Sequence, residues 1–398
     1  MTVDFQQVRT QVKQLGESAA QNARERDRLR QQAFSLLEQY AAQSGFLLER
    51  VERIARLHDP NLRCALPALG PGTPPEALNF RGALPPSLPQ ATLLAADGSQ
   101  INPDRHAQVD YSLVNVGAIQ VRLELPDAPQ ISVTTRLLYD DELYTPEGVL
   151  SETQVALMRD LHERRRLAEL AADALPPVIT FTDGPLELWG ARDGHESQAF
   201  ERSLEEYQQA LRALQQQGAT TAGYVDKPSA NLVVRLLEIA ALEEAELKDA
   251  KKKRPLGRVS DRSLFQELLE PGERSAVFAM QSRSAQRYRD ELRLHFFYLN
   301  VGRPGKPWLS RVEIPLWVAE NRESLDGLHA VLYQQCRIMG SRPYPYLIHR
   351  AHEAAVVSLE EKDQITQMIV SELNRRGVEV GEVSQKQSTK DLARRTRL

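Results

Sequence analysis

The order of strand-like and helical segments between residues 91 and 250 constrains the fold more than any other feature of this chain. The short apolar run Ala91–Ala96 is followed by two alternating stretches rich in β-branched residues, 111–123 and 131–138. An amphipathic helical pattern then runs from Ser151, a suitable N-cap, to the helix-stopping pair at Pro176. Three strands followed by a helix predict an α/β domain with a mixed sheet.

The rest of this region makes the prediction more specific. Strand-like segments alternate with helical ones, in the order strand 178–182, helix 198–217, strand 220–225 and helix 229–247. Three strands, a helix, a strand, a helix, a strand and a helix form the element order of the RNase H-like fold. We therefore expect an RNase H-like mixed sheet flanked by helices.

The segments before residue 91 and after residue 250 have different patterns of apolar residues and prolines. Residues 5–57 place apolar side chains at three- and four-residue steps, which predicts long amphipathic helices, and the proline-rich stretch 59–90 predicts an extended connection. Beyond residue 255, strands near 292–301 and 310–317 and helices near 322–336 and 362–376 are expected. The predicted parts are the N-terminal helices and connection (1–90), the core (91–250), a C-terminal α+β part (251–383) and a basic polar tail (384–398).

Composition narrows the functional classes. The net charge of −4 argues against binding nucleic acid by bulk positive charge, so any DNA contact must come from local basic clusters. No window has the apolar length of a membrane span, and no secretory signal is evident, which predicts a cytoplasmic protein without a membrane partner. Cys64 and Cys336 belong to no CxxC pair, so we expect both to be buried and inert. Walker, GxSxG and HExxH motifs are also missing.

Acidic residues follow three of the predicted strands, at Asp97, Asp183 and Asp226. Asp-Gly pairs at strand ends are often simple turns, but ligands of α/β sheets gather beyond the carboxyl ends of the strands. Asp97 and Asp183 are 183 − 97 = 86 residues apart, which leaves room for a hairpin and a helix. Their strands are adjacent and parallel in an RNase H-like sheet, so the two carboxylates are expected to face each other.

Clustered carboxylates suit phosphodiester hydrolysis, because Mg²⁺ and Mn²⁺ prefer oxygen ligands and two such ions activate water and neutralise the phosphorane. A third carboxylate is expected from the helix that starts at Ser151, where the candidates are Glu163 and Glu169. They lie about 240° apart around a helix, so both cannot face one site. We prefer Glu163, which lies beside the apolar stripe, and Asp226 is the next candidate if neither glutamate serves.

Three segments together resemble the NurA nucleases that work with the hexameric translocase HerA. They are Ala95-Ala-Asp-Gly-Ser99, Phe181-Thr-Asp-Gly-Pro-Leu186 and Tyr344-Pro-Tyr-Leu-Ile-His-Arg-Ala-His352. The last is the most telling, because no strand or helix period explains a Tyr-Pro start followed by a histidine 352 − 344 = 8 residues later. The resemblance extends from about residue 90 to 370.

The resemblance implies a Mn²⁺- or Mg²⁺-dependent exonuclease and single-strand endonuclease. It also implies a homodimer that docks on a HerA-like hexameric ATPase in DNA end resection and repair. Carried over residue by residue, the resemblance makes Asp97 and Asp183 metal ligands, and makes Tyr344 and His352 a C-terminal pair in the site, where His352 is expected to bind a metal or protonate the leaving oxygen. Lys227 is similar to a family lysine that contacts the scissile phosphate or the attacking water. Glu163, chosen from helix geometry, completes the predicted metal ligands, because the glutamate spacing departs from the family pattern. Pro185 departs from the serine that is common in the family. His349 and Glu353 lie near His352, but only His352 is in the matching position.

A second function stays open at this point. A non-catalytic NurA-like subunit would keep the fold and bind DNA, or act as an adaptor, without cutting. Asp97, Asp183 and His352 are all present, which favours the active enzyme.

Overall fold

A computed structural model describes residues 3–70, 73–104, 107–123, 125, 128–145, 148–190, 196–378 and 380. The predicted basic tail, 384–398, lies outside these residues. The chain divides into two compact units. We call Met1–Leu88 with Tyr224–Pro343 the N-terminal unit, and Pro89–Gly223 with Tyr344–Leu398 the RNase H-like unit. The earlier division into four parts remains a prediction.

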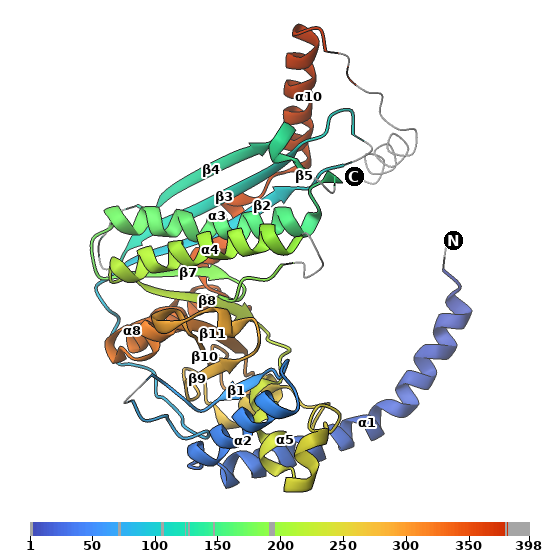
Figure 1. The fold of residues 1–398 in the computed structure, drawn as a ribbon, viewed down its shortest axis with the longest axis vertical. Helices are drawn as coiled ribbons and strands as arrows, with labels where there is room; N and C mark the ends of the chain where they lie inside the picture. The colour runs from blue at the N-terminus through green and yellow to red at the C-terminus, as the bar shows by residue number, and fades with distance from the viewer. Residues whose placement is uncertain are drawn as a thin grey trace. The chain divides into compact units, whose positions relative to one another are not determined.

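The sheet of the RNase H-like unit has the strand order β4–β3–β2–β7–β8 (Figure 1). Its strands are β2 (Thr92–Ile101), β3 (Ser112–Arg122), β4 (Gln130–Leu138), β7 (Val178–Asp183) and β8 (Thr220–Asp226), which passes into the N-terminal unit. β3 pairs antiparallel with both β2 and β4, whereas β2 and β7 are parallel. This mixed order is that of the RNase H-like fold, so the predicted fold class is confirmed.

Helices cover both faces of this sheet. Alternate side chains of β2, such as Leu94 and Ala96, pack with Val155 and Leu167 of α3 (Glu152–Asp173) in one core cluster. α4 (Glu196–Gln216) packs beside α3, as Figure 1 shows. α9 (Tyr346–Ala355) crosses the opposite face over β2 and β3, and α10 (Leu359–Arg375) packs through Ile365 against the ends of those strands.

The predicted α3 begins as its sequence indicates. Ser151 is the N-cap, and its hydroxyl accepts from the backbone N–H of Gln154, while the Gln154 side chain accepts from the backbone of Ser151. This capping box satisfies two amide groups that a helix start leaves unpaired. A short 3₁₀ turn (Asp140–Glu142) and the hairpin of β5 (Tyr144–Thr145) and β6 (Gly148–Val149) precede it.

The N-terminal unit confirms the predicted amphipathic helices, α1 (Phe5–Gln39) and α2 (Ser44–Leu57). Its sheet has the order β1–β9–β10–β11, formed by β1 (Cys64–Leu66), β9 (Phe278–Gln281), β10 (Leu294–Asn300) and β11 (Leu309–Pro315). Its other helices are α5 (Leu232–Ala241), α6 (Asp261–Leu268), α7 (Leu316–Ala319) and α8 (Arg322–Ile338), with 3₁₀ turns at Glu244–Asp249, Ala285–Arg287 and Asp290–Leu292.

One strand differs from its prediction in a way that matters for the site. The sequence indicates that the strand from Ala91 ends at Asp97, because Asp and Gly are disfavoured inside strands. The structure shows β2 continuing to Ile101, since β3 pairs with it along its whole length. Asp97 therefore lies inside a strand and not at its end.

The two cysteines and the apolar length of the helices were also subjects of prediction. Cys64 and Cys336 are free and buried, as predicted, and burial raises the pKa of each thiol to about 12. Such thiols carry little thiolate and are poor nucleophiles. Among the helices that the structure describes, none is long and apolar enough to cross a membrane.

Candidate functional site: a carboxylate and histidine cluster

Asp97 lies where two parallel strands stop pairing. The ladder between β2 and β7 ends at Ala96 and Thr182, so Asp97 and Asp183 are the next residues of the two strands. This register makes the two aspartates neighbours on adjacent parallel strands, and the expectation that their carboxylates face each other stays a prediction. Asp183 is exposed at the end of β7, whereas the Asp97 side chain is only 15% exposed.

His352 is the direct partner of Asp97. Its Nδ1 donates a hydrogen bond of 2.7 Å to Asp97 Oδ2, across 255 residues of sequence. The imidazole itself is 58% exposed. A carboxylate that accepts from one ring nitrogen fixes the orientation of the ring and leaves the other nitrogen, Nε2, for a ligand.

The position of α9 explains this contact. Gly117 is the cross-strand partner of Asp97, and a Cβ atom there would lie 2.6 Å from the carbonyl oxygen of Ala351. The missing side chain therefore lets the helix backbone lie directly on the sheet. At the end of α9, the Asn115 amide donates to the carbonyl of Ala355 over 2.8 Å, and the Ser99 hydroxyl donates to the same oxygen. Carbonyls at a helix end lack partners within the helix, so these bonds anchor α9 to β2 and β3.

Glu163 approaches β2 from the other face. A Cβ atom on Gly98 would lie 2.7 Å from Glu163 Oε1 and 2.4 Å from Arg159 Cγ. Gly98 therefore leaves the space into which the Glu163 carboxylate extends. The Glu163 side chain is only 8% exposed, and its Oε1 lies 3.4 Å from Arg159 Nε, one helical turn earlier.

The charged side chains near Gly98 change one another's pKa values. Burial raises the pKa of Glu163 well above its usual value, and the neighbouring carboxylates Asp160 and Asp97 raise it further. Burial also raises the pKa of Asp160, against the opposing effect of Arg159 and with a further contribution from Asp97. Three carboxylates on two elements are thus close enough to repel one another, and a cation among them would relieve that repulsion.

Arg164 holds α3 in the position that this arrangement requires. It is almost fully buried and donates to Thr182 of β7 over 2.8 Å and to Thr221 of β8 over 3.0 Å. Its guanidinium carbon also lies 5.7 Å from the ring centroid of Tyr207 in α4. In the sequence, Arg164 begins the basic run Arg164–Arg166, and such runs are typical of a solvated helix face. The burial of Arg164 shows that this general pattern does not hold for this residue.

Three further candidates from the sequence belong to α3, to the residue before the N-cap of α9 and to the residue after β8. Glu169 is 64% exposed and pairs with Arg166 over 3.0 Å, on a different side of α3 from Glu163. Tyr344 is half-buried just before the start of α9. Lys227 belongs to the N-terminal unit, where its Nζ lies 4.0 Å from the ring centroid of Trp308.

Sequence reasoning missed several contributors. Asp160 stands three residues before Glu163, a spacing that places two side chains on one helix face and was a usable signal. Gly98 and Gly117 gave no such signal, because their role depends on helices that approach from opposite faces. Within the described residues, no three His, Cys, Asp or Glu side chains are grouped so as to hold a metal ion as they stand.

The fold and the cluster define a class: an RNase H-like α/β protein with carboxylates and a histidine where two parallel strands separate. The NurA domain family model matches residues 91–357. The chain therefore belongs to the NurA domain family. The matched segment includes Asp97, Glu163, Asp183 and His352.

Several solved nuclease structures are similar to this chain at low sequence identity. The NurA nuclease from Sulfolobus solfataricus is 12% identical, with a TM-score of 0.42, covering 72% of this chain and 85% of that one. Endonuclease V from Ciona intestinalis, solved with a 23mer DNA containing an inosine, is 11% identical, with a TM-score of 0.33 and coverage of 81% and 97%. Endonuclease V from Bacillus subtilis is 13% identical, with a TM-score of 0.29 and coverage of 66% and 79%. No curated protein matches the chain.

Proposed function

We propose that this protein is a divalent-metal-dependent DNA nuclease, an exonuclease and single-strand endonuclease acting in the cytoplasm in DNA end resection and repair. Membership of the NurA domain family supports this proposal. The observation that carries it is the position of Asp97, beside Asp183 where β2 and β7 stop pairing and near the buried Glu163 carboxylate across Gly98.

The residues present fit a hard divalent cation. Mg²⁺ and Mn²⁺ take carboxylate oxygens, and the repulsion that raises the pKa of Glu163 is what a cation would neutralise. Asp97, Glu163 and Asp183 would supply the oxygen ligands and His352 a nitrogen. One or two bound metal ions would make water a better nucleophile and would neutralise charge on the phosphate.

The chain's own groups would have distinct roles. Because His352 Nδ1 donates to Asp97, its Nε2 is available to a metal ion or to a leaving 3′ oxygen. Tyr344 would stack on a base or hydrogen-bond a phosphate. Lys227 is proposed to contact the DNA backbone, a role that the family resemblance suggests.

Cleavage of a labelled linear duplex and of circular single-stranded DNA tests the function. We expect both substrates to be cut with Mn²⁺ and neither to be cut with excess EDTA. Binding of DNA without any cleavage in Mn²⁺ or Mg²⁺ would contradict the nuclease and favour the non-catalytic subunit.

We also propose a homodimer that docks on a HerA-type hexameric translocase. Support for the dimer comes from the start of α1, where Phe5, Val8, Val12 and Leu15 follow one another at steps of three and four residues and are 64%, 41%, 58% and 69% exposed. Such a row is typical of the seam of a two-helix coiled coil, and a two-fold axis would place the same row of a second copy against it.

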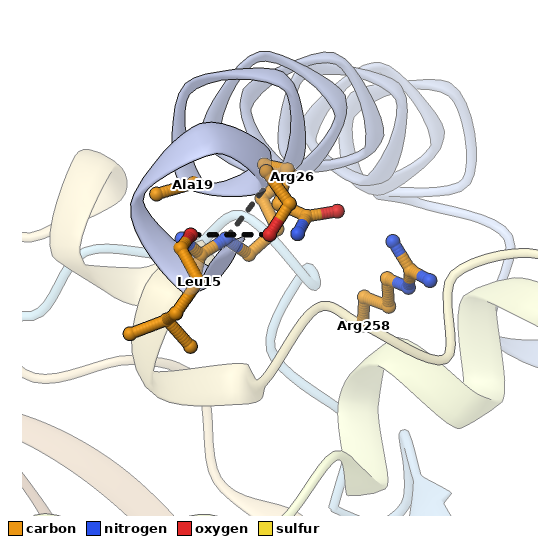
Figure 2. Close-up of a pocket in the computed structure, with 6 residues that line it drawn as sticks. Leu15, Ala19, Arg26 and Arg258 are labelled. Atoms are coloured by element: carbon orange, nitrogen blue, oxygen red, sulfur yellow. Dashed lines mark hydrogen bonds between the residues drawn. The ribbon is translucent and has the colours of Figure 1, made fainter. Parts of the chain in front are cut away.

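The row leads into a hollow between α1 and Arg258 (Figure 2). This hollow has a volume of about 480 Å³ and is lined by Leu15, Ser18, Ala19, Asn22, Arg26 and Arg258. It continues the seam toward the part of α1 that is buried at Leu29 and Ala33.

Light scattering tests the dimer. We expect a mass of twice 44.9 kDa at micromolar concentration, and we expect Val12→Glu with Leu15→Glu to give the monomer, because two charges would enter an apolar seam. Gln14→Glu with Glu17→Gln, on another side of the helix, is the matched control and should remain dimeric. A wild-type mass near 44.9 kDa would contradict the proposal.

A further inference from the structure

One exposed lysine of the N-terminal unit is held in place unusually well. Lys227 directly follows β8, and its Nζ lies 4.0 Å from the ring centroid of Trp308. Its backbone has φ 43°, in the left-handed region that side chains with a Cβ atom disfavour. Non-glycine residues in this region cluster at functional sites, where the strain belongs to preorganisation.

Trp308 is itself fixed at both ends. Its indole Nε1 donates to Asp226 Oδ1 over 2.7 Å, and its backbone N–H donates to Asn300 Oδ1 over 3.1 Å. Asn300 is 1% exposed, and its amide donates to the carbonyl of Leu269 over 2.8 Å. The ring that faces the lysine is thus anchored to the buried end of β10 and to Asp226 at the end of β8.

The ring holds the lysine without neutralising it. A cation–π contact orients an ammonium group, but an indole has no net charge, so the full positive charge remains for an external anion. Arg303 and Lys306, both exposed, are on the same β10–β11 hairpin as Trp308. In a protein with a net charge of −4, such local clusters must supply the contacts to a polyanion.

We propose that Trp308 and Asp226 are positioning residues that pre-align Lys227 to contact a backbone phosphate of DNA. This inference rests on the proposed nuclease function and deepens it, because it names two residues outside the carboxylate cluster. Asp226 then serves the lysine through Trp308, and not as the metal ligand considered from the sequence.

Binding of a fluorescent single-stranded oligonucleotide, measured by anisotropy in EDTA at several salt concentrations, tests the proposal without requiring cleavage. Lys227→Gln should weaken binding about tenfold and reduce the slope of log K against log salt by about 0.7, as expected for one lost phosphate contact. Lys13→Gln, an equal charge change on α1, is the matched control and should change binding less than about twofold. Lys227→Arg should restore most of the affinity, because arginine keeps the charge and also stacks on indole.

A double-mutant cycle separates positioning from a merely structural role. Trp308→Leu alone should weaken binding about threefold to tenfold, but in the Lys227→Gln background it should add less than about twofold, since coupled residues are not additive. Trp308→Phe, which keeps an aromatic face and loses the donor to Asp226, supplies the same cycle if Trp308→Leu fails to fold. Melting curves of each variant report on folding.

Two results would overturn the inference while leaving the nuclease standing. One is a wild type that binds and cuts DNA while Lys227→Gln behaves like Lys13→Gln. The other is additive losses for Trp308 and Lys227. A wild type that neither binds nor cuts DNA would instead overturn the proposed function and this inference with it.

Discussion

Asp97→Asn is expected to reduce DNA cleavage by about a thousandfold or more, since a metal-centred stabilisation of several kcal/mol depends on the lost ligand. Folding should be unaffected, because asparagine keeps an oxygen that can accept from His352 and removes a charge that repels Glu163. Initial cleavage rates and thermal midpoints of the purified proteins measure the two effects.

Asp183→Asn extends this prediction to the neighbouring strand. The β2–β7 register places Asp183 beside Asp97, so a similar loss is expected. Asp173→Asn, at the exposed end of α3, is the matched control and should cut DNA at the wild-type rate. Wild-type rates for both Asp97→Asn and Asp183→Asn, with unchanged melting, would remove these aspartates from the site.

Glutamine substitutions at the two candidate glutamates of α3 are expected to have very different effects on the cleavage rate. Glu163→Gln should lower the cleavage rate about a hundredfold or more, because a buried carboxylate beside two others loses its charge. Glu169→Gln should leave the rate within about twofold, since an exposed ion pair contributes little. The two substitutions are chemically identical and six residues apart on the same helix.

Cleavage rates of the Glu163→Gln and Glu169→Gln variants at saturating Mn²⁺ show which glutamate, if either, is the third ligand. Equal and small losses would show that the third ligand is neither glutamate, and Asp160, which shares the helix face of Glu163, would be tested next. A larger loss for Glu169→Gln would contradict the packing of α3 on β2.

The sequence predicted the fold of the RNase H-like unit because its pattern is local. Alternation gave β3 and β4, the N-cap candidate Ser151 gave the start of α3, and the order of elements then specified which strands are neighbours. From that order alone, Asp97 and Asp183 could be expected to lie beside each other, and the register agrees.

The rest of the cluster depends on tertiary contacts that no local pattern encodes. Nothing near Asp97 in sequence indicates that His352 would contact it, because that contact requires α9 to lie on Gly117. The run at Arg164 resembles a solvated face, and only the threonines of β7 and β8 show why one of its members is buried. Asp-Gly-Ser resembles a turn, yet pairing with β3 keeps it in a strand.

Titrating Mn²⁺ into the protein, while following the free ion by electron paramagnetic resonance, tests most directly whether a metal binds at Asp97. Wild type should remove one or two ions per chain from solution, and Asp97→Asn should lose at least one of them while Asp173→Asn binds as wild type does. Equal Mn²⁺ binding by wild type and Asp97→Asn, or DNA cleavage by wild type in excess EDTA, would contradict a metal centre at Asp97.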